Sequence, residues 1–150
     1  MKRIRWFCFN IYYFFSSLPY LMSTSLSKST KWAIIGKYLL GNILNQLLGF
    51  RSLSIFNLTI NSFDWATVFW LFGEVFLRSE YFFTTTKTTP VIIDCGANTG
   101  MTTLYHKRLY PQSTLYSFEP NKLAFSILQK NILQNKLENV LLFQQAVADY

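Results

Sequence analysis

Apolar and polar positions alternate in a regular way after Pro90. Short apolar runs predict three strands, at residues 91–94, 114–118 and 139–147. The segments between them, 100–110 and 121–136, have apolar positions at helical spacing, and Asn121 can cap the second helix. Strands joined in this way form parallel βαβ units with right-handed crossovers. The pattern therefore predicts a doubly wound α/β fold, whose sheet binds ligands at the carboxyl ends of its strands.

The first half of the chain is dominated by helical patterns. Residues 31–50 approximate the apolar stripe of an amphipathic helix, and residues 51–60 predict a short strand or one arm of a hairpin. Residues 62–76 predict a mostly buried helix, with Ser62 or Asp64 as its cap. These patterns divide the chain into an N-terminal helical region and an α/β domain, at residues 1–52 and 53–150.

Residues 1–22 begin with a basic tip and continue as an aromatic-rich apolar run, which a polar linker follows at 23–30. This shape is typical of a signal peptide or of a membrane-surface anchor. Polar residues and Pro19 interrupt the run, which would need roughly 20 residues to span a membrane. The run is bulky and no A-x-A cleavage site follows it, so a helix packed on the protein is a third alternative. We expect a cytoplasmic protein that contacts a membrane surface, if at all, through this segment.

Composition and charge exclude several classes of protein. Half of the 150 residues are apolar and 19% are aromatic, which predicts a packed core rather than disorder. Two cysteines and one histidine exclude a disulfide scaffold and a Cys/His metal cluster, so we expect no metal site. We expect Cys95 to be a small buried residue and His106 to be structural or exposed. The net charge is +7 and no acid precedes Asp64, but Lys107 and Arg108 suit the end of a helix and imply no nucleic-acid partner.

The segment "VIIDCGANTG", residues 91–100, follows a strand with an acid and two glycines. A turn between a strand and a helix directs free backbone N–H groups at whatever lies above it. Gly96 lets the backbone bend and a ligand approach, Asn98 tolerates a left-handed conformation, and Gly100 lets the helix pack closely against the strand. The same residues also fit a tight structural turn that binds nothing.

A second acid favours a nucleoside-bearing cofactor. Glu119 ends the second strand about twenty residues beyond the turn, where a carboxylate can accept both hydroxyl protons of a ribose. A nicotinamide fingerprint would need glycines where Asn98 and Met101 stand. Asp94 suits the ammonium group of a methionine tail, whereas it would repel a pyrophosphate. The pattern therefore favours S-adenosylmethionine over NAD, and a nicotinamide-dependent oxidoreductase is the alternative.

Three segments resemble the first three motifs of the FkbM-type methyltransferases: "VIIDCGANTGMTTLY", "LYSFEPNKLAFSILQKNI" and "NVLLFQQAVAD". The resemblance covers residues 91–149 and implies an S-adenosylmethionine-dependent enzyme on the class I Rossmann-like fold. The residues that match the family's first cofactor motif and its ribose-binding acid are Asp94, Gly96, Ala97, Asn98, Gly100 and Glu119. Asp149 falls in the family's A-x-x-D segment, near the adenine pocket. Cys95 and Thr99 depart from the family, where small or aliphatic residues are common.

The resemblance also implies the reaction, transfer of a methyl group to an oxygen of a small molecule or sugar. No residue stands out as a catalytic base. A class I sheet usually has seven strands and the sequence stops after the third, so we expect an incomplete sheet, a fragment or truncated copy, and no activity of the chain alone. The first strand would then form an open hydrophobic edge. The alternative from a different class is a non-catalytic remnant that binds a membrane or a partner.

Overall fold

The computed structural model describes residues 2–49 and 51–148, and within the helices it leaves out the side chains of residues 2–11, 13, 42, 43, 45–48, 65 and 66. Two helices and a hairpin come first: α1 (Lys2–Ser23), α2 (Lys28–Leu48), β1 (Ser52–Ile55) and β2 (Leu58–Asn61). Next are helix α3 (Trp65–Phe72) and the π-helical turn η1 (Gly73–Leu77). The α/β part consists of β3 (Val91–Cys95), α4 (Met101–Leu109), β4 (Thr114–Phe118), α5 (Lys122–Gln134) and β5 (Val140–Phe143).

The α/β part has the predicted Rossmann-like arrangement. Strands β3, β4 and β5 are parallel and adjacent in chain order, so β3 forms one edge of the sheet. Asn121 caps α5, because its side chain accepts from the N–H groups of Leu123 and Ala124. Strand β5 ends at Phe143 and is shorter than the predicted run to residue 147. The fold class is thus confirmed, and the sheet is open rather than closed on itself.

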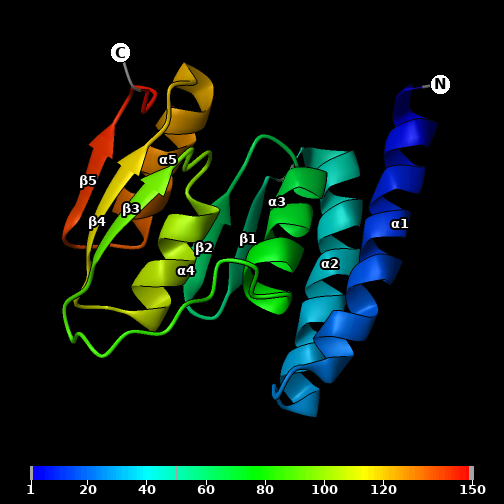
Figure 1. Ribbon diagram of the computed structural model, residues 1–150. Coiled ribbons are helices and arrows are strands. Elements are labelled where there is room, and N and C mark those ends of the chain that lie inside the picture. The colour runs from blue at the N-terminus through cyan, green and yellow to red at the C-terminus, as the bar shows by residue number, and fades with distance from the viewer. Residues whose placement is uncertain (1, 50, 149–150) are drawn as a thin grey trace.

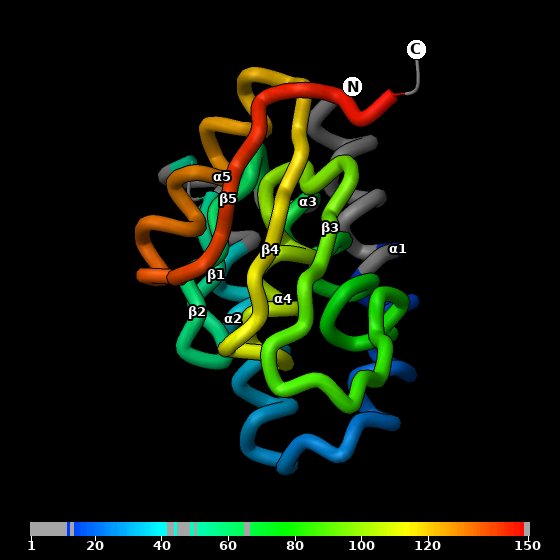
Figure 2. Tube along the Cα trace, turned by 60° about the vertical axis from the view of Figure 1, so that its left-hand side comes forward, coloured from blue at the N-terminus to red at the C-terminus, as the bar shows by residue number. Residues whose placement is uncertain are grey.

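Helices α4 and α5 cover one face of this sheet and leave the other face open. Figure 2 views the open face, with the three strands in front of both helices. Along β3, Ile92 is buried, whereas Val91 and Ile93 are 67% and 66% exposed. Cys95, which was expected to be buried, is also exposed. Strand β3 therefore buries only every second residue of its apolar run, because successive side chains point to opposite faces of the sheet.

The N-terminal half forms a stack of elements beside α4 and α5 (Figure 1). Helix α1 packs on α3 and η1, and α2 packs on α3 and β1. Within α1, Leu21 is buried and the ring of Phe14 stacks on Tyr38 of α2, with ring centroids 4.4 Å apart. Pro19 lies inside the helix without ending it, and the predicted linker shortens to residues 24–27. The described part of α1 thus packs on its neighbours, which is the third of the alternatives considered for this segment. Across the described residues, no helix combines the length and apolarity needed to cross a membrane.

The main hydrophobic cluster joins both halves of the chain. It runs from Leu21 of α1 and Ile34 of α2, through Phe72 of α3, to Leu104 of α4. A second, smaller cluster lies under α5 and contains Ala97, Phe125, Leu128 and Ile132.

Asp64, one of the two predicted caps, accepts a hydrogen bond from the N–H of Thr67 at 2.8 Å and begins α3. On α4, Met101, Leu104 and Tyr105 are buried, whereas Leu109 is exposed.

Candidate functional site

The turn that links β3 to α4 lies at the carboxyl end of the sheet. Three of its residues have left-handed backbone conformations: Gly96 at φ 85°, Asn98 at φ 50° and Gly100 at φ 88°. The bend at Gly96 and the left-handed Asn98 were predicted and are confirmed. At Gly100, a Cβ atom would lie 2.6 Å from Cδ1 of Leu128, a residue of α5. Gly100 therefore permits close packing against α5, and not, as predicted, against the strand.

Hydrogen bonds within the chain fasten the turn to β4. The N–H groups of Gly96 and Ala97 both donate to the carbonyl of Phe118, each at 2.9 Å. The N–H of Asn98 donates to Oε2 of Glu119, also at 2.9 Å. The prediction that the turn directs free N–H groups at a ligand is therefore wrong for these three residues. What the turn does offer is space, because no atom lies within 4 Å of a Cβ built on Gly96.

Glu119 is buried and holds two segments together. Its Oε1 accepts a hydrogen bond from the N–H of Asn121 at 2.7 Å, while its Oε2 accepts the one from Asn98. The carboxylate therefore joins the β3 turn to the start of α5. Each carboxylate oxygen has a second lone pair, so the group keeps acceptor capacity for hydroxyl donors. The ribose-binding role of Glu119 stays a prediction, beside a structural role that the sequence did not reveal.

Asp94 ends up half-buried at the tip of β3, where two threonines hold it. Its Oδ2 accepts hydrogen bonds from Oγ1 of Thr102 at 2.7 Å and from Oγ1 of Thr103 at 2.9 Å. Thr103 also bonds to the hydroxyl of Ser117 on β4, at 3.0 Å. Toward the described residues, Oδ1 of Asp94 makes no hydrogen bond. The sequence analysis missed both threonines, although two hydroxyl residues in the first turn of α4, directly after Met101, were a usable signal.

Asn131 of α5 is a second residue that the sequence analysis missed. It is fully buried, and its Nδ2 donates to the carbonyl of Thr99 in the turn at 2.7 Å. The same amide pairs with Asn61 of β2: Oδ1 accepts from the Asn61 N–H at 2.8 Å and Nδ2 donates to the Asn61 carbonyl at 2.9 Å. Asn131 thus ties the turn to the hairpin. A polar residue among the apolar positions of α5 was the signal that could have found it.

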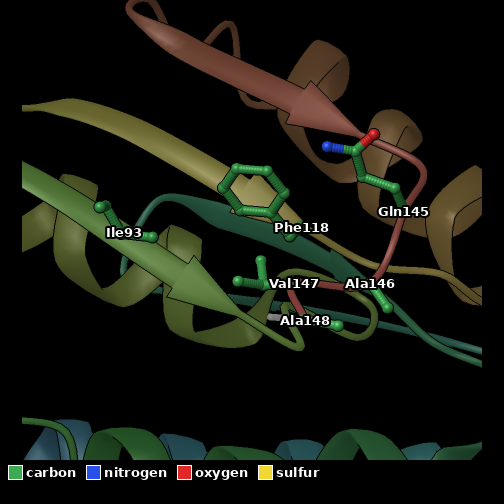
Figure 3. A pocket seen from close by; sticks show the side chains of 6 residues that line it. All are labelled: Ile93, Phe118, Gln145, Ala146, Val147 and Ala148. Carbon is green, nitrogen blue, oxygen red and sulfur yellow. The ribbon is translucent and has the colours of Figure 1, made fainter. Parts of the chain in front are cut away.

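A pocket of about 520 Å³ opens on the uncovered face beside the turn. Figure 3 shows Ile93 on β3 and Phe118 on β4, with the segment after β5 curling over them. That segment contributes Gln145 and three small or apolar residues, of which Val147 lies among the strand side chains. The volume lies in the range of small-molecule sites, and the lining is mostly apolar with one amide. Ile93 and Phe118 directly precede Asp94 and Glu119 in the sequence, but neither carboxylate lines the pocket. Asp94 is bonded to Thr102 and Thr103 of α4, on the face of the sheet that the helices cover.

The other candidate residues have structural roles or lie elsewhere. His106 is buried and its Nε2 pairs with the carbonyl of Tyr81 at 3.0 Å, which leaves it away from the turn. The ammonium group of Lys107 donates to the carbonyls of Pro111 and Ser113, and burial lowers its pKa. Asp149, the predicted neighbour of the adenine pocket, lies outside the residues that the structure describes.

Comparison with known proteins shows which proteins the chain is similar to. No family model matches the chain. It is 35% identical over 65 residues to "Methyltransferase sdnD" of Sordaria araneosa, covering 43% of this chain and 25% of that protein. It is 43% identical over 67 residues to "Methyltransferase 1" of Beauveria bassiana (strain ARSEF 2860), covering 45% of this chain and 26% of that protein. The chain is similar to methyltransferases. It spans about a quarter of the length of these two relatives.

The fold is also similar to that of a solved structure. The crystal structure of M. jannaschii TYW2, in complex with AdoMet, matches with a TM-score of 0.50 and 25% identity. The match covers 61% of this chain and 41% of that chain. The likeness agrees with the Rossmann-like sheet, while the FkbM resemblance stays a prediction.

Proposed function

We propose that the chain forms the cofactor-binding part of an S-adenosylmethionine-dependent methyltransferase of the FkbM type. The observation that carries the proposal is the hydrogen bond from Asn98 to Glu119, which joins the glycine turn after β3 to the acid at the end of β4. Carboxyl ends of neighbouring parallel strands are where such sheets bind nucleoside ligands. The similarity to two methyltransferases, and to the TYW2 solved with AdoMet, supports the choice of cofactor.

The side chains around the turn suit the parts of this cofactor. Glu119 would accept the ribose hydroxyls through the lone pairs that its two backbone bonds leave. Asp94, through Oδ1, would hold the ammonium group of the methionine tail, while Thr102 and Thr103 keep its carboxylate oriented. The pocket under Val147 would take the adenine ring on apolar surface. When bound, the cofactor supplies a methyl group on a positively charged sulfur, which an acceptor oxygen can displace.

The acceptor in this proposal is a small molecule or a sugar, and not a nucleic acid. The family resemblance supplies the preference for oxygen. Charge argues against a nucleic-acid acceptor, because residues 64–150 carry as many acids as basic residues. Of the two basic residues that follow His106, Lys107 donates to loop carbonyls and Arg108 lies over the ring of Phe56. Phosphate backbones are usually bound by several accessible basic side chains.

Calorimetric titration with S-adenosylhomocysteine tests the cofactor, using both the full chain and Glu119→Gln. In this variant an amide NH₂ group replaces one carboxylate oxygen, so one of the two backbone N–H groups loses its acceptor. The remaining oxygen is uncharged, so its hydrogen bonds are weaker. We expect affinity to fall by about 1–3 kcal/mol, or roughly 5- to 150-fold. Glu138→Gln is the matched control, because Glu138 is an exposed acid away from the turn. Its affinity should equal that of the unaltered chain.

A second titration separates ribose binding from the structural role of Glu119. Removing the ribose 2′-hydroxyl from the ligand should weaken binding to the unaltered chain, and should matter less in Glu119→Gln, as in a double-mutant cycle. Equal losses in both proteins would assign Glu119 to the turn alone. NADH binding in preference to S-adenosylhomocysteine would overturn the cofactor and favour the oxidoreductase alternative. Absence of binding at high micromolar ligand would overturn the proposed function.

A further inference from the structure

The outer surface of α2 is unusual for a helix on the outside of a protein. Its inner face is already used, since Ile34 and Tyr38 are buried in the main cluster. Its outer face is apolar as well: Trp32 is 69% exposed, Leu39 52% and Leu40 56%. An ordinary surface helix has polar residues opposite its core stripe. Helix α2 therefore presents large apolar side chains on two sides, of which one is buried in the main cluster and the other is largely exposed.

These exposed residues form one stripe with positive charge at its borders. At 3.6 residues per turn, Trp32, Leu39 and Leu40 fall within an arc of about 100° around the helix axis. Lys28 lies just beyond one border of this arc and Lys37 beyond the other. Both lysines are exposed, and Lys37 donates to the carbonyl of Ser54, which holds it beside the stripe. A groove of about 200 Å³ continues the apolar surface from Leu40 toward β1.

The net positive charge of the chain lies in its N-terminal part, which includes α2. Fourteen basic and seven acidic residues give a net charge of +7. Residues 1–63 contain seven of the basic residues and none of the acids, so they carry the whole net charge while residues 64–150 are neutral. An apolar stripe with lysine borders, in an acid-free segment, matches a surface that is apolar at depth and negatively charged at its rim. A membrane that contains anionic lipids has this chemistry.

We infer that α2 docks the protein on the surface of an anionic membrane. Trp32, Leu39 and Leu40 enter the boundary between headgroups and acyl chains, and Lys28 and Lys37 stay among the headgroups. The helix lies in the plane of the membrane and does not cross it. This places the contact on α2 rather than on residues 1–22. The inference is independent of the proposed methyl transfer.

Sedimentation with lipid vesicles tests the docking, using phosphatidylcholine vesicles with and without phosphatidylserine. The full chain should bind only the vesicles with phosphatidylserine. Raising the ionic strength from about 0.1 M to about 1 M should weaken binding, because the Debye length falls from about 10 Å to about 3 Å. The double variant Lys28→Glu/Trp32→Ser should bind about 10- to 50-fold more weakly.

The matched control on α5, Lys130→Glu/Leu133→Ser, makes the same charge change and also replaces an exposed apolar residue by serine. Leu133 is 77% exposed, and this variant has the same net charge as the α2 variant. Its vesicle affinity should stay within about twofold of the unaltered chain, apart from general charge effects. Equal weakening by both variants would overturn the inference, as would equal binding to neutral vesicles or no binding at all. A dimer that dissociates when Trp32 is replaced, without vesicle binding, would assign the stripe to a second copy of the chain and overturn it too.

Discussion

Two carboxylates hold the turn after β3 in its conformation through hydrogen bonds within the chain. Glu119 accepts two backbone N–H groups, and Asp94 accepts two threonine hydroxyls. Hydrogen bonds to ionised acceptors are stronger than neutral ones, so each carboxylate fixes the segment around it. In the proposed enzyme, each acid would bind the cofactor in addition to holding the turn. A ligand that approaches them meets groups whose orientation is already set, which lowers the entropic cost of binding.

Alanine substitutions at three glycines, two in the turn and one in α2, should change the free energy of unfolding by different amounts. At Gly100, alanine would combine a left-handed backbone with a Cβ only 2.6 Å from Leu128, so Gly100→Ala should lower the free energy of unfolding by about 2–4 kcal/mol. Gly96 has a similar backbone at φ 85° but open space, so Gly96→Ala should cost about 1–2 kcal/mol. Gly36 lies inside α2 with no neighbour within 4 Å, and Gly36→Ala should stabilise by about 0.5–1 kcal/mol. Urea unfolding measures all three, and any other order would contradict this account of the turn.

At the scale of elements, two asparagines on α5 join that helix to the hairpin. Asn131 pairs with the backbone of Asn61, and Asn135 pairs with the backbone of Thr59 through a 2.7 Å bond from the Thr59 N–H and another to its carbonyl. Each amide therefore imitates a neighbouring strand along the edge of β2. The additional bond from Asn131 to Thr99 links this contact to the glycine turn. The hairpin thus supports the candidate site without touching a ligand.

Replacing these asparagines one at a time measures the link. Asn131→Ala removes several buried hydrogen bonds and leaves the carbonyl of Thr99 without that donor, so we expect a loss of about 3–5 kcal/mol in unfolding free energy. Asn135→Ala, at a partly exposed position, should cost about 1–2 kcal/mol. Denaturant titration of both variants is the measurement. Equal costs would mean that the bond to Thr99 does not hold the turn.

Local patterns predicted most elements but not their long-range contacts. The strand at 91–95, the helix after it and the caps Asp64 and Asn121 follow from residues that lie next to one another in the sequence. The bonds of Asn131 join residues from three separate segments, and no periodicity encodes them. The turn residues of the candidate site were found by their types, whereas the bonds that occupy their N–H groups depend on where β4 lies. The third strand was predicted to reach residue 147, but it ends at Phe143, where Gln144 and Gln145 interrupt the apolar run.

At the scale of the whole molecule, the described helices cover only one face of the sheet. Helices α4 and α5 lie between the sheet and the N-terminal elements, as Figure 1 shows. On the open face the rings of Phe118 and Phe143 stack with centroids 4.7 Å apart, and Tyr116 stacks on Phe143 as well. An apolar run such as residues 91–93 can be buried on one face or on both, and its sequence alone does not distinguish the two. Which residues of the strand are buried depends on the face of the sheet against which the helices pack.

Two neighbouring isoleucines of β3 test this one-sided arrangement. Ile92 is buried and Ile93 is 66% exposed, yet both are β-branched and share one strand. Threonine keeps the branched shape and the strand propensity, so the pair isolates the effect of burial. Ile92→Thr removes buried apolar surface and buries a hydroxyl, and should cost about 2–3 kcal/mol in urea unfolding. Ile93→Thr should change the free energy of unfolding by less than about 0.5 kcal/mol. Similar costs at both positions would mean that the face is covered in solution, and a concentration-dependent midpoint would then show that a second copy covers it.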